Sequence, residues 1–193
     1  MVANRGYAST DSRTRQQLIE AASQLLEEEG AHAISARRVA ARADLKPQLV
    51  HYYFRTMEDL LVAVFRYATE EYMKLHDAAL ASAQPLRALW ELNSNMPNVR
   101  RNMAFVALGA IHENLRIEMK ASGENFRALQ EQQIAKVLAD VGIDPDAFPP
   151  ASIAMTMSAI ARTLAMEGPI GIDAGHKELR AVIERFLDRL EPL

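Results

Sequence analysis

The sequence contains no cysteine, which excludes both a disulfide framework and a metal site built on thiolates. No apolar run approaches the ~20 residues that a membrane-spanning helix needs, and the polar N-terminus shows no signal peptide. An alternating strand pattern and an internal repeat are also missing. We therefore expect a cytoplasmic protein that has no contact with a membrane and contains no β-sheet.

The patterns of catalytic and metal chemistry are missing as well. The histidines lie far apart, and no H-E-x-x-H spacing places two of them on one helix face. Gly168, Gly171 and Gly175 are spaced unlike G-x-G-x-x-G and follow a helical pattern, which favours a loop over a phosphate-binding turn. Nothing pairs a nucleophile with a base. We expect no metal, no cofactor and no enzymatic activity.

Helical periodicity runs through most of the chain. Apolar residues recur at helical spacing over residues 12–29, and a second stripe runs from Leu60 to Leu75. Prolines and glycines divide the remainder, with Gly123 as an expected break between two helices. The later helices are expected over residues 86–93, 98–120, the stretch from Phe126 to Val141, 151–166 and 177–190.

Residues 35–60 carry the most informative pattern, which is a short helix, a turn, a second short helix and the start of a third. Ser35 is suited to cap the first helix. Asp44 falls at the turn, where tolerance of the left-handed backbone conformation is useful. Pro47 suits the first position of the second helix, because its missing N–H would be unpaired there. This arrangement is typical of proteins that present the second helix to the DNA major groove.

The second helix, expected to end near Tyr53, has two different faces. Val50, Tyr53 and Phe54 fall on one side at spacings that suit packing. The other side is free for contacts with DNA, although a solvated surface is the alternative interpretation. It carries Lys46, Gln48, His51, Tyr52 and Arg55.

These segments resemble the TetR family of bacterial transcriptional regulators. The matching motifs are Gly30, Ser35, Val39-Ala40, Ala43-Asp44-Leu45-Lys46, His51-Tyr52-Tyr53-Phe54 and Thr56-Met57-Glu58-Asp59-Leu60. The family has Gly, Ser and Lys where this chain has Asp44, Lys46 and Met57, and Lys46 and Arg55 can replace the charge that Met57 lacks. The resemblance implies an all-α fold with an N-terminal three-helix helix-turn-helix domain and a C-terminal helical bundle for ligand binding and dimerisation.

We accordingly expect a flexible N-terminal arm over residues 1–11, a DNA-binding domain over 12–55 and an effector-binding and dimerisation domain over 56–193. The formal charge is −3 over the whole chain. Residues 1–55 carry eight Lys or Arg against six Asp or Glu, while residues 56–193 carry fourteen against nineteen. The positive charge is therefore in the part that is expected to meet DNA.

Each candidate DNA contact has a physical role. Gln48 is suited to pair bidentately with adenine, Leu49 to touch a thymine methyl group, and His51 to bond a base edge or a phosphate. Lys46 and Tyr52 suit phosphate oxygens. Arg38 and Arg42 lie four residues apart, so one helix face can present both to the DNA backbone, with solvated surface charge as the alternative. That set is Arg37, Arg38, Arg42, Lys46, Pro47, Gln48, Leu49, His51, Tyr52, Arg55 and Thr56.

In the C-terminal half, polar groups that lie singly among apolar helix positions are candidates for orienting a small apolar effector. The predicted ligand-binding residues are Trp90, Asn93, Met103 and His112, with core packing as the alternative. For the last two helices, the family resemblance implies a four-helix interface with a second copy, and burial within one chain is the alternative. The residues predicted for that interface are Ile153, Met157, Ile160, Leu164, Ile183, Phe186, Leu187 and Leu190.

Taken together, these features predict a ligand-responsive DNA-binding transcriptional regulator. A repressor that binds a near-palindromic double-stranded operator as a homodimer is the favoured form. The alternative is an all-helical small-molecule or protein-binding module whose helix-turn-helix is vestigial.

Overall fold

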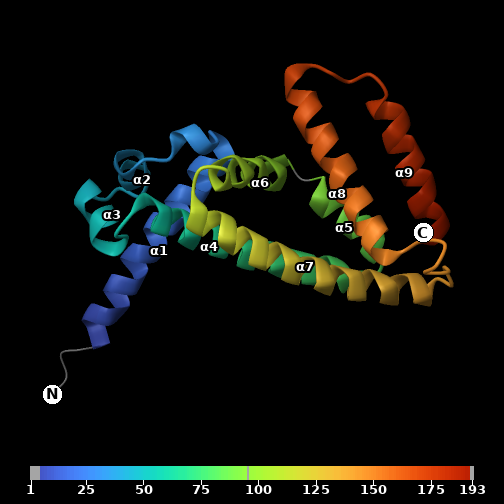
Figure 1. Ribbon diagram of the computed structural model, residues 1–193, viewed down its shortest axis with the longest axis horizontal. Helices are drawn as coiled ribbons and strands as arrows, with labels where there is room; N and C mark the ends of the chain where they lie inside the picture. Colours follow the sequence, from blue (N-terminus) through green and yellow to red (C-terminus); the bar gives the residue numbers. More distant parts are fainter. Residues whose placement is uncertain (1–4, 95, 192–193) are drawn as a thin grey trace. The chain divides into compact units, whose positions relative to one another are not determined.

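The computed structural model describes residues 5–94 and 96–191, and every regular element among them is helical (Figure 1). The all-α prediction is therefore confirmed for the described residues. The elements in chain order are α1 (Arg5–Glu28), η1 (Ala31–Ala33), α2 (Ala36–Arg42), α3 (Pro47–Tyr53), α4 (Met57–Leu80), α5 (Pro85–Asn93), α6 (Met96–Gly109), α7 (Glu113–Asp140), α8 (Pro150–Glu167), η2 (Gly168–Ile170) and α9 (His176–Leu190).

The chain forms two compact units. The first comprises Met1–Glu71 and Arg100–Lys120, and the second comprises Tyr72–Val99 and Ala121–Leu193. The division differs from the expected one after residue 55, because the first half of α4 and most of α6 pack with the N-terminal helices. Both α4 and α7 contribute residues to each unit.

Two helix boundaries differ from the sequence-based prediction. Helix α1 begins at Arg5, so residues 5–11, which were expected to be irregular, are helical, while residues 1–4 lie outside the described residues. The break expected at Gly123 falls instead between α6 and α7, and Gly123 lies inside α7. A single glycine costs a helix only about 1 kcal/mol, which a long helix can absorb.

A tertiary contact explains where α7 begins. The Glu58 carboxylate, on α4, accepts hydrogen bonds from the backbone N–H of Asn114 at 2.7 Å and from its side-chain amide at 3.2 Å. Close by, Arg66 on α4 forms a two-armed ion pair with Glu118 on α7 at 2.8 and 2.7 Å. The start of α7 is thus capped by another helix, which no local sequence pattern reports.

One hydrophobic core organises the first unit. It joins the apolar stripes of α1 and α4 to the inner faces of α2 and α3, and Leu18, Val39, Val50 and Leu60 are almost completely buried in it. The stripe predicted along α4 is correct up to Ala68, but Leu75 is 50% exposed. This core holds α3 by one side only, which leaves its other side free.

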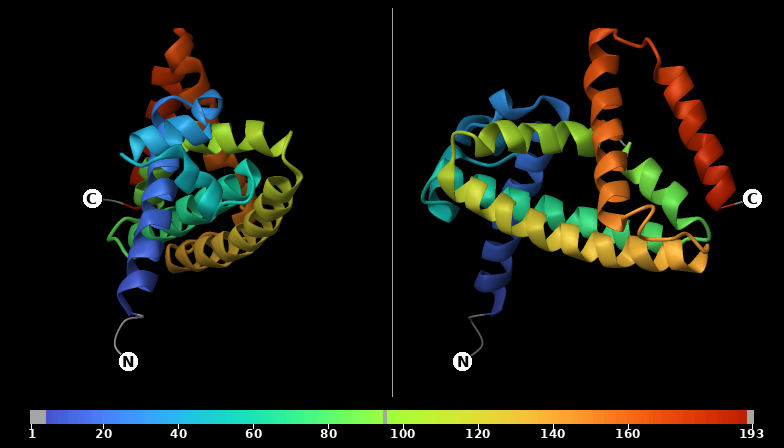
Figure 2. Two further views of the ribbon diagram at one scale, coloured as in Figure 1. Left: turned by 90° about the vertical axis from the view of Figure 1, so that its left-hand side faces the viewer. Right: turned by 45° about the vertical axis from the view of Figure 1, so that its right-hand side comes forward.

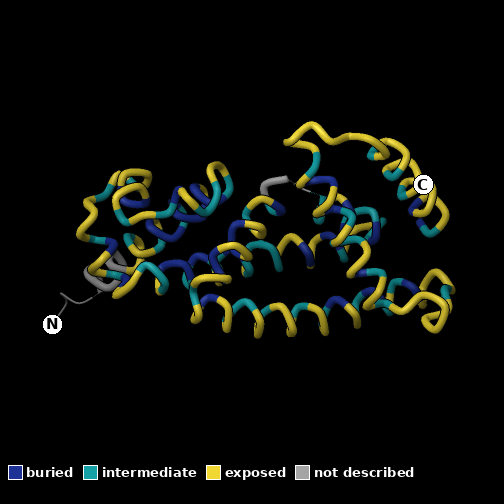
Figure 3. The backbone as a smooth tube through the Cα atoms, turned by 45° about the horizontal axis from the view of Figure 1, so that its top comes forward, coloured by how far each residue is buried: buried dark blue, intermediate teal, exposed yellow. Residues whose placement is uncertain are grey.

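The second unit contains two smaller cores. One gathers around Leu89, Ile134 and Leu138, and the other around Trp90, Leu164 and residues of α9. Figure 2 shows α8 and α9 joined through η2 but standing apart along their lengths. In the tube view, α9 shows mostly exposed and intermediate positions (Figure 3). Buried positions are therefore sparse on α9, which matters for the site described below.

Candidate DNA interface and effector pocket

The local features predicted for the helix-turn-helix are present. The Ser35 hydroxyl accepts a hydrogen bond from the Arg38 backbone N–H at 3.3 Å, as an N-cap should. Asp44 adopts the left-handed conformation with φ 55°, and Pro47 occupies the first turn of α3. These three devices fix the path by which the chain turns from α2 into α3.

Helix α3 has the two faces that its sequence predicts. Val50 and Phe54 are buried in the first core, and the Arg15 guanidinium lies 5.1 Å from the centre of the Phe54 ring. Leu49 differs from the other predicted base contacts, because it is half-buried and packs against this core. The exposed side carries Tyr52, which is 71% exposed, together with Lys46, Pro47, Gln48, His51 and Arg55.

Arg38 and Arg42 lie on the exposed side of α2, and both are engaged by carboxylates from the end of α1. Arg38 pairs with Glu29, and Arg42 pairs with Glu28. The hydrogen bond from Arg42 lowers the pKa of Glu28, and the same bond raises the pKa of Arg42. These carboxylate partners were not anticipated from the sequence. Arg37, the third predicted arginine of α2, is exposed.

Thr56 opens α4 through a reciprocal cap. Its hydroxyl accepts from the Asp59 backbone N–H at 3.0 Å, and its own N–H donates to the Asp59 carboxylate at 3.0 Å. Thr56 and Asp59 therefore form a capping box at the start of α4. The Thr56 hydroxyl hydrogen stays available for a phosphate, because the cap uses only the oxygen as an acceptor.

The four predicted ligand-binding residues do not share one environment. Trp90 is buried and lines a pocket in the second unit. Asn93, at the end of α5, donates to the Leu89 carbonyl at 2.7 Å and accepts from the Tyr72 hydroxyl at 3.3 Å. Met103 and His112 belong to the first unit, on α6 and just after it, so they do not line this pocket.

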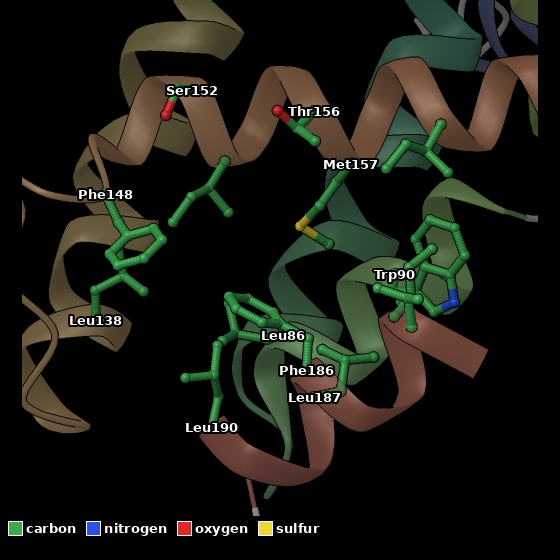
Figure 4. Close-up of a pocket in the computed structure, with 14 residues that line it drawn as sticks. Leu86, Trp90, Leu138, Phe148, Ser152, Thr156, Met157, Phe186, Leu187 and Leu190 are labelled. Atoms are coloured by element: carbon green, nitrogen blue, oxygen red, sulfur yellow. The ribbon is translucent and has the colours of Figure 1, made fainter. Parts of the chain in front are cut away.

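The pocket has a volume of about 310 Å³ and is bounded by α5, the end of α7, the loop that follows it, α8 and α9 (Figure 4). Its wall is almost wholly apolar, and sequence reasoning missed Phe148, Ser152, Thr156 and Val182 in it. Ser152 and Thr156 are four residues apart on α8, a spacing that gives one helix face two hydroxyls. That spacing was the available sequence signal.

Most residues predicted for the dimer interface line this same pocket within one chain. They are Ile153, Met157, Ile160, Ile183, Phe186, Leu187 and Leu190. The remaining one, Leu164, is buried in the core beside Trp90. The structure thus gives these apolar stripes an intrachain role, which was the alternative interpretation.

His76 is a buried polar residue in the second unit. It is completely buried on α4 beside the rings of Tyr72 and Phe126, and neither ring nitrogen has a hydrogen-bond partner among the described residues. Burial lowers its pKa, and the nearby Asp77 opposes this effect in part. Burial also raises the pKa of Tyr72 to about 12. Both side chains are therefore neutral near pH 7.

Comparison with known proteins shows a likeness to one family over the helix-turn-helix. The family model described as "Bacterial regulatory proteins, tetR family" matches residues 18–64, which contain α2, α3 and the turn between them. The N-terminal region of this chain is thus similar to that family. The resemblance inferred from the sequence motifs is therefore confirmed.

Curated transcriptional regulators are similar to part of this chain. The HTH-type transcriptional regulator BetI of Yersinia pestis (strain Pestoides F) is 40% identical over 85 residues, which is 41% of this chain and 43% of that protein. The BetI of Yersinia pseudotuberculosis serotype O:1b (strain IP 31758) matches to the same extent. This chain thus matches less than half the length of these relatives.

Solved structures extend the likeness of fold along the chain. A putative transcriptional regulator from Saccharomonospora viridis, solved in complex with choline, has a TM-score of 0.72 and 19% identity, covering 90% of this chain and 96% of its own. Another putative transcriptional regulator, from Rhodococcus sp. RHA1, also has a TM-score of 0.72 and 19% identity, covering 93% of this chain and 100% of its own. These TM-scores show a shared fold.

Two further features of the described residues bear on partners. No described helix is long and apolar enough to cross a membrane. No group of three His, Asp or Glu side chains within residues 5–94 and 96–191 is placed to hold a metal ion.

Proposed function

We propose that this protein is a ligand-responsive transcriptional regulator of the TetR type that represses its target by binding a near-palindromic operator as a homodimer. The observation that carries the proposal is the exposed side of α3. It carries Lys46, Gln48, His51 and Tyr52, while the opposite side of the helix packs against the core. Such a helix is suited to enter a major groove without unfolding anything. A regulator of this kind would work in the cytoplasm, where bacterial DNA lies.

The predicted contacts divide into those that position the protein and those that read bases. Lys46, Tyr52 and Arg55 are suited to phosphates, while Gln48 and His51 are suited to base edges. Two copies are needed because one recognition helix spans too few base pairs for specific control, and two-fold symmetry then requires a near-palindromic site.

The test is a mobility-shift titration with fragments of the upstream region of the protein's own gene. We expect Lys46→Ala to weaken binding to all sequences similarly and Gln48→Ala to relax discrimination at one base pair, with about 1–3 kcal/mol lost. Lys136→Ala and Gln132→Ala are matched controls, since both residues are exposed on α7 in the second unit.

Normal operator binding by a folded variant with alanine at Lys46, Gln48, His51 and Tyr52 would refute the recognition assignment. Absence of operator binding by the wild-type protein, with ligand binding retained, would instead favour the alternative of a helical binding module with a vestigial helix-turn-helix.

The effector part of the proposal assigns ligand binding to the second unit. The choline complex of the neighbour from Saccharomonospora viridis makes a small-molecule ligand a reasonable proposal for this fold. A ligand shifts DNA binding only by its differential affinity for two conformations, and a tenfold change requires about 1.4 kcal/mol of coupling.

A further inference from the structure

The pocket beneath α9 has the size of a small-molecule site. Its volume of about 310 Å³ is roughly twice that of the ~150 Å³ engineered apolar cavity that holds benzene, and it reaches the lower end of the range for ligand pockets. Figure 4 shows side chains from α5, α8 and α9 converging on it, with Trp90 at one end and Phe148 at the other. A molecule of about two fused rings matches this volume.

The C-terminal end of α9 is tied to α5. The buried Glu191 carboxylate accepts hydrogen bonds from the backbone N–H groups of Leu86 at 2.7 Å and Arg87 at 3.0 Å, which caps the first turn of α5. Arg87 in turn forms ion pairs with Glu184 and Asp188 on α9. These contacts fix this end of α9 against α5.

The other end of α9 is tied to α8. His176, the first residue of α9, lies 2.7 Å from a carboxylate oxygen of Glu167, the last residue of α8. Between the two ties, Val182, Ile183 and Phe186 face the pocket. Closing the pocket would require α9 to move as a whole and to break one of these attachments, so the space is held open by specific contacts.

The wall of the pocket specifies the chemistry of its occupant. No acidic or basic side chain lines it, so an ion would lose its hydration without gaining a partner. The polar side chains in the wall are Ser152, Thr156 and the largely apolar Trp90. Ser152 donates its proton to the Pro149 carbonyl at 2.7 Å, which leaves its oxygen free to accept. Because Ser152 is exposed, a hydroxyl on the ligand would take the place of solvent as the donor to that oxygen.

We infer that this pocket binds an uncharged lipophilic molecule of about two rings that carries a hydroxyl group. The inference deepens the proposed function, on which its regulatory meaning rests, by naming the site and the ligand class. Because α8 and α9 are also the helices proposed for dimerisation, a ligand that sets their separation would act on the dimer.

The one tryptophan of the sequence lines the pocket and supplies a direct readout. The experiment titrates the full-length protein with 1-naphthol and follows both Trp90 fluorescence and heat by calorimetry. We expect saturable binding that changes Trp90 emission, at least tenfold tighter than binding of naphthalene-1-sulfonate, which has the same rings and a negative charge. Ser152→Ala should weaken 1-naphthol binding and leave naphthalene unaffected.

Thr156→Phe should fill the pocket and weaken 1-naphthol binding at least tenfold. The matched control is Thr163→Phe, which makes the same substitution at an exposed α8 residue outside the pocket wall. Circular dichroism and melting temperature verify that both variants fold.

Equal binding by both variants, or no saturable binding by the wild type, would overturn the inference. So would the result that Thr156→Phe changes only the dimer dissociation constant, since a second copy would then be the occupant. None of these readouts involves DNA. If 1-naphthol binds as expected but leaves operator affinity unchanged, the pocket stands and the proposed regulatory function fails.

Discussion

Single charges at the end of α1 shape what the predicted DNA contacts can do. Glu28 and Glu29 hold Arg42 and Arg38, the two arginines that were predicted to meet the DNA backbone. DNA phosphates must either displace these carboxylates from the arginines or bind where the carboxylates have reduced the positive potential. The pairs lie on the surface, so salt screens them and their contribution to stability is small.

We therefore predict that the double variant Glu28→Gln, Glu29→Gln binds operator DNA about two- to tenfold more tightly at low salt and depends more steeply on salt concentration, because more counterions are released. Mobility shifts across a salt series measure both quantities, and Glu131→Gln on α7 is the matched control. Weaker binding by the double variant would mean that the carboxylates position the arginines for DNA.

A second single residue, His76, makes the stability of the fold depend on pH. Its folded-state pKa is lowered by burial, so the unfolded chain binds a proton more readily than the folded one. Its contribution is fully present above the unfolded pKa of 6.5 and is lost progressively as the pH falls below that value. We predict up to about 1 kcal/mol less stability at pH 5.5 than at pH 7 from this residue.

Urea unfolding of wild type and His76→Phe at both pH values measures that contribution, because the variant keeps the aromatic packing and removes the titration. If both proteins lost the same free energy of unfolding between pH 7 and pH 5.5, groups other than His76 would account for that loss.

Among the elements, α4 and α7 are coupled at their N-terminal ends. Glu58 caps α7, and Arg66 binds Glu118 with both arms of its guanidinium. The first contact replaces a local N-cap and the second fixes the neighbouring turn. The two contacts hold the start of α7 in the unit that contains the helix-turn-helix.

We predict that Glu58→Ala lowers the free energy of unfolding by about 1 kcal/mol, as loss of an N-cap usually does. Denaturant unfolding measures it, and Glu131→Ala on the exposed side of α7 serves as the control. If the two variants were equally stable, the contact would have no role in fixing the break before α7.

Assembly is decided by which apolar residues remain outside once the chain has folded. Leu187 is buried within the chain, so a charge there would damage the fold itself. On α8, Met155 and Met166 are 54% and 52% exposed, and Ala159 and Arg162 lie between them on the same exposed face. This face is a better probe of the proposed dimer than the inward stripes.

We predict that Met155→Glu with Met166→Glu converts the proposed dimer into a folded monomer with a large loss of operator affinity. Sedimentation velocity at micromolar concentration measures the state, and Thr163→Glu on the same helix tests whether an added charge alone suffices. A wild-type monomer, or a variant that remains dimeric, would contradict the proposed interface.

Features that depend on neighbouring residues could be predicted from the amino-acid sequence alone. The Ser35 cap, the left-handed Asp44, Pro47 at the start of α3 and the Thr56–Asp59 cap all arise from contacts within a few positions. The family motif lies in the same stretch. Local chemistry was therefore sufficient for the helix-turn-helix.

Features that join distant parts of the chain could not be predicted in this way, because they depend on how the helices pack. The cap from Glu58 moved the helix break away from Gly123, and α1 supplied partners for Arg38 and Arg42. The same apolar stripes on α8 and α9 would suit either a dimer interface or an internal pocket. Periodicity shows which face of a helix is apolar, but it does not show what that face packs against. Their meeting around Trp90 depends on the attachments of α9, whose partners lie about a hundred residues away in the sequence.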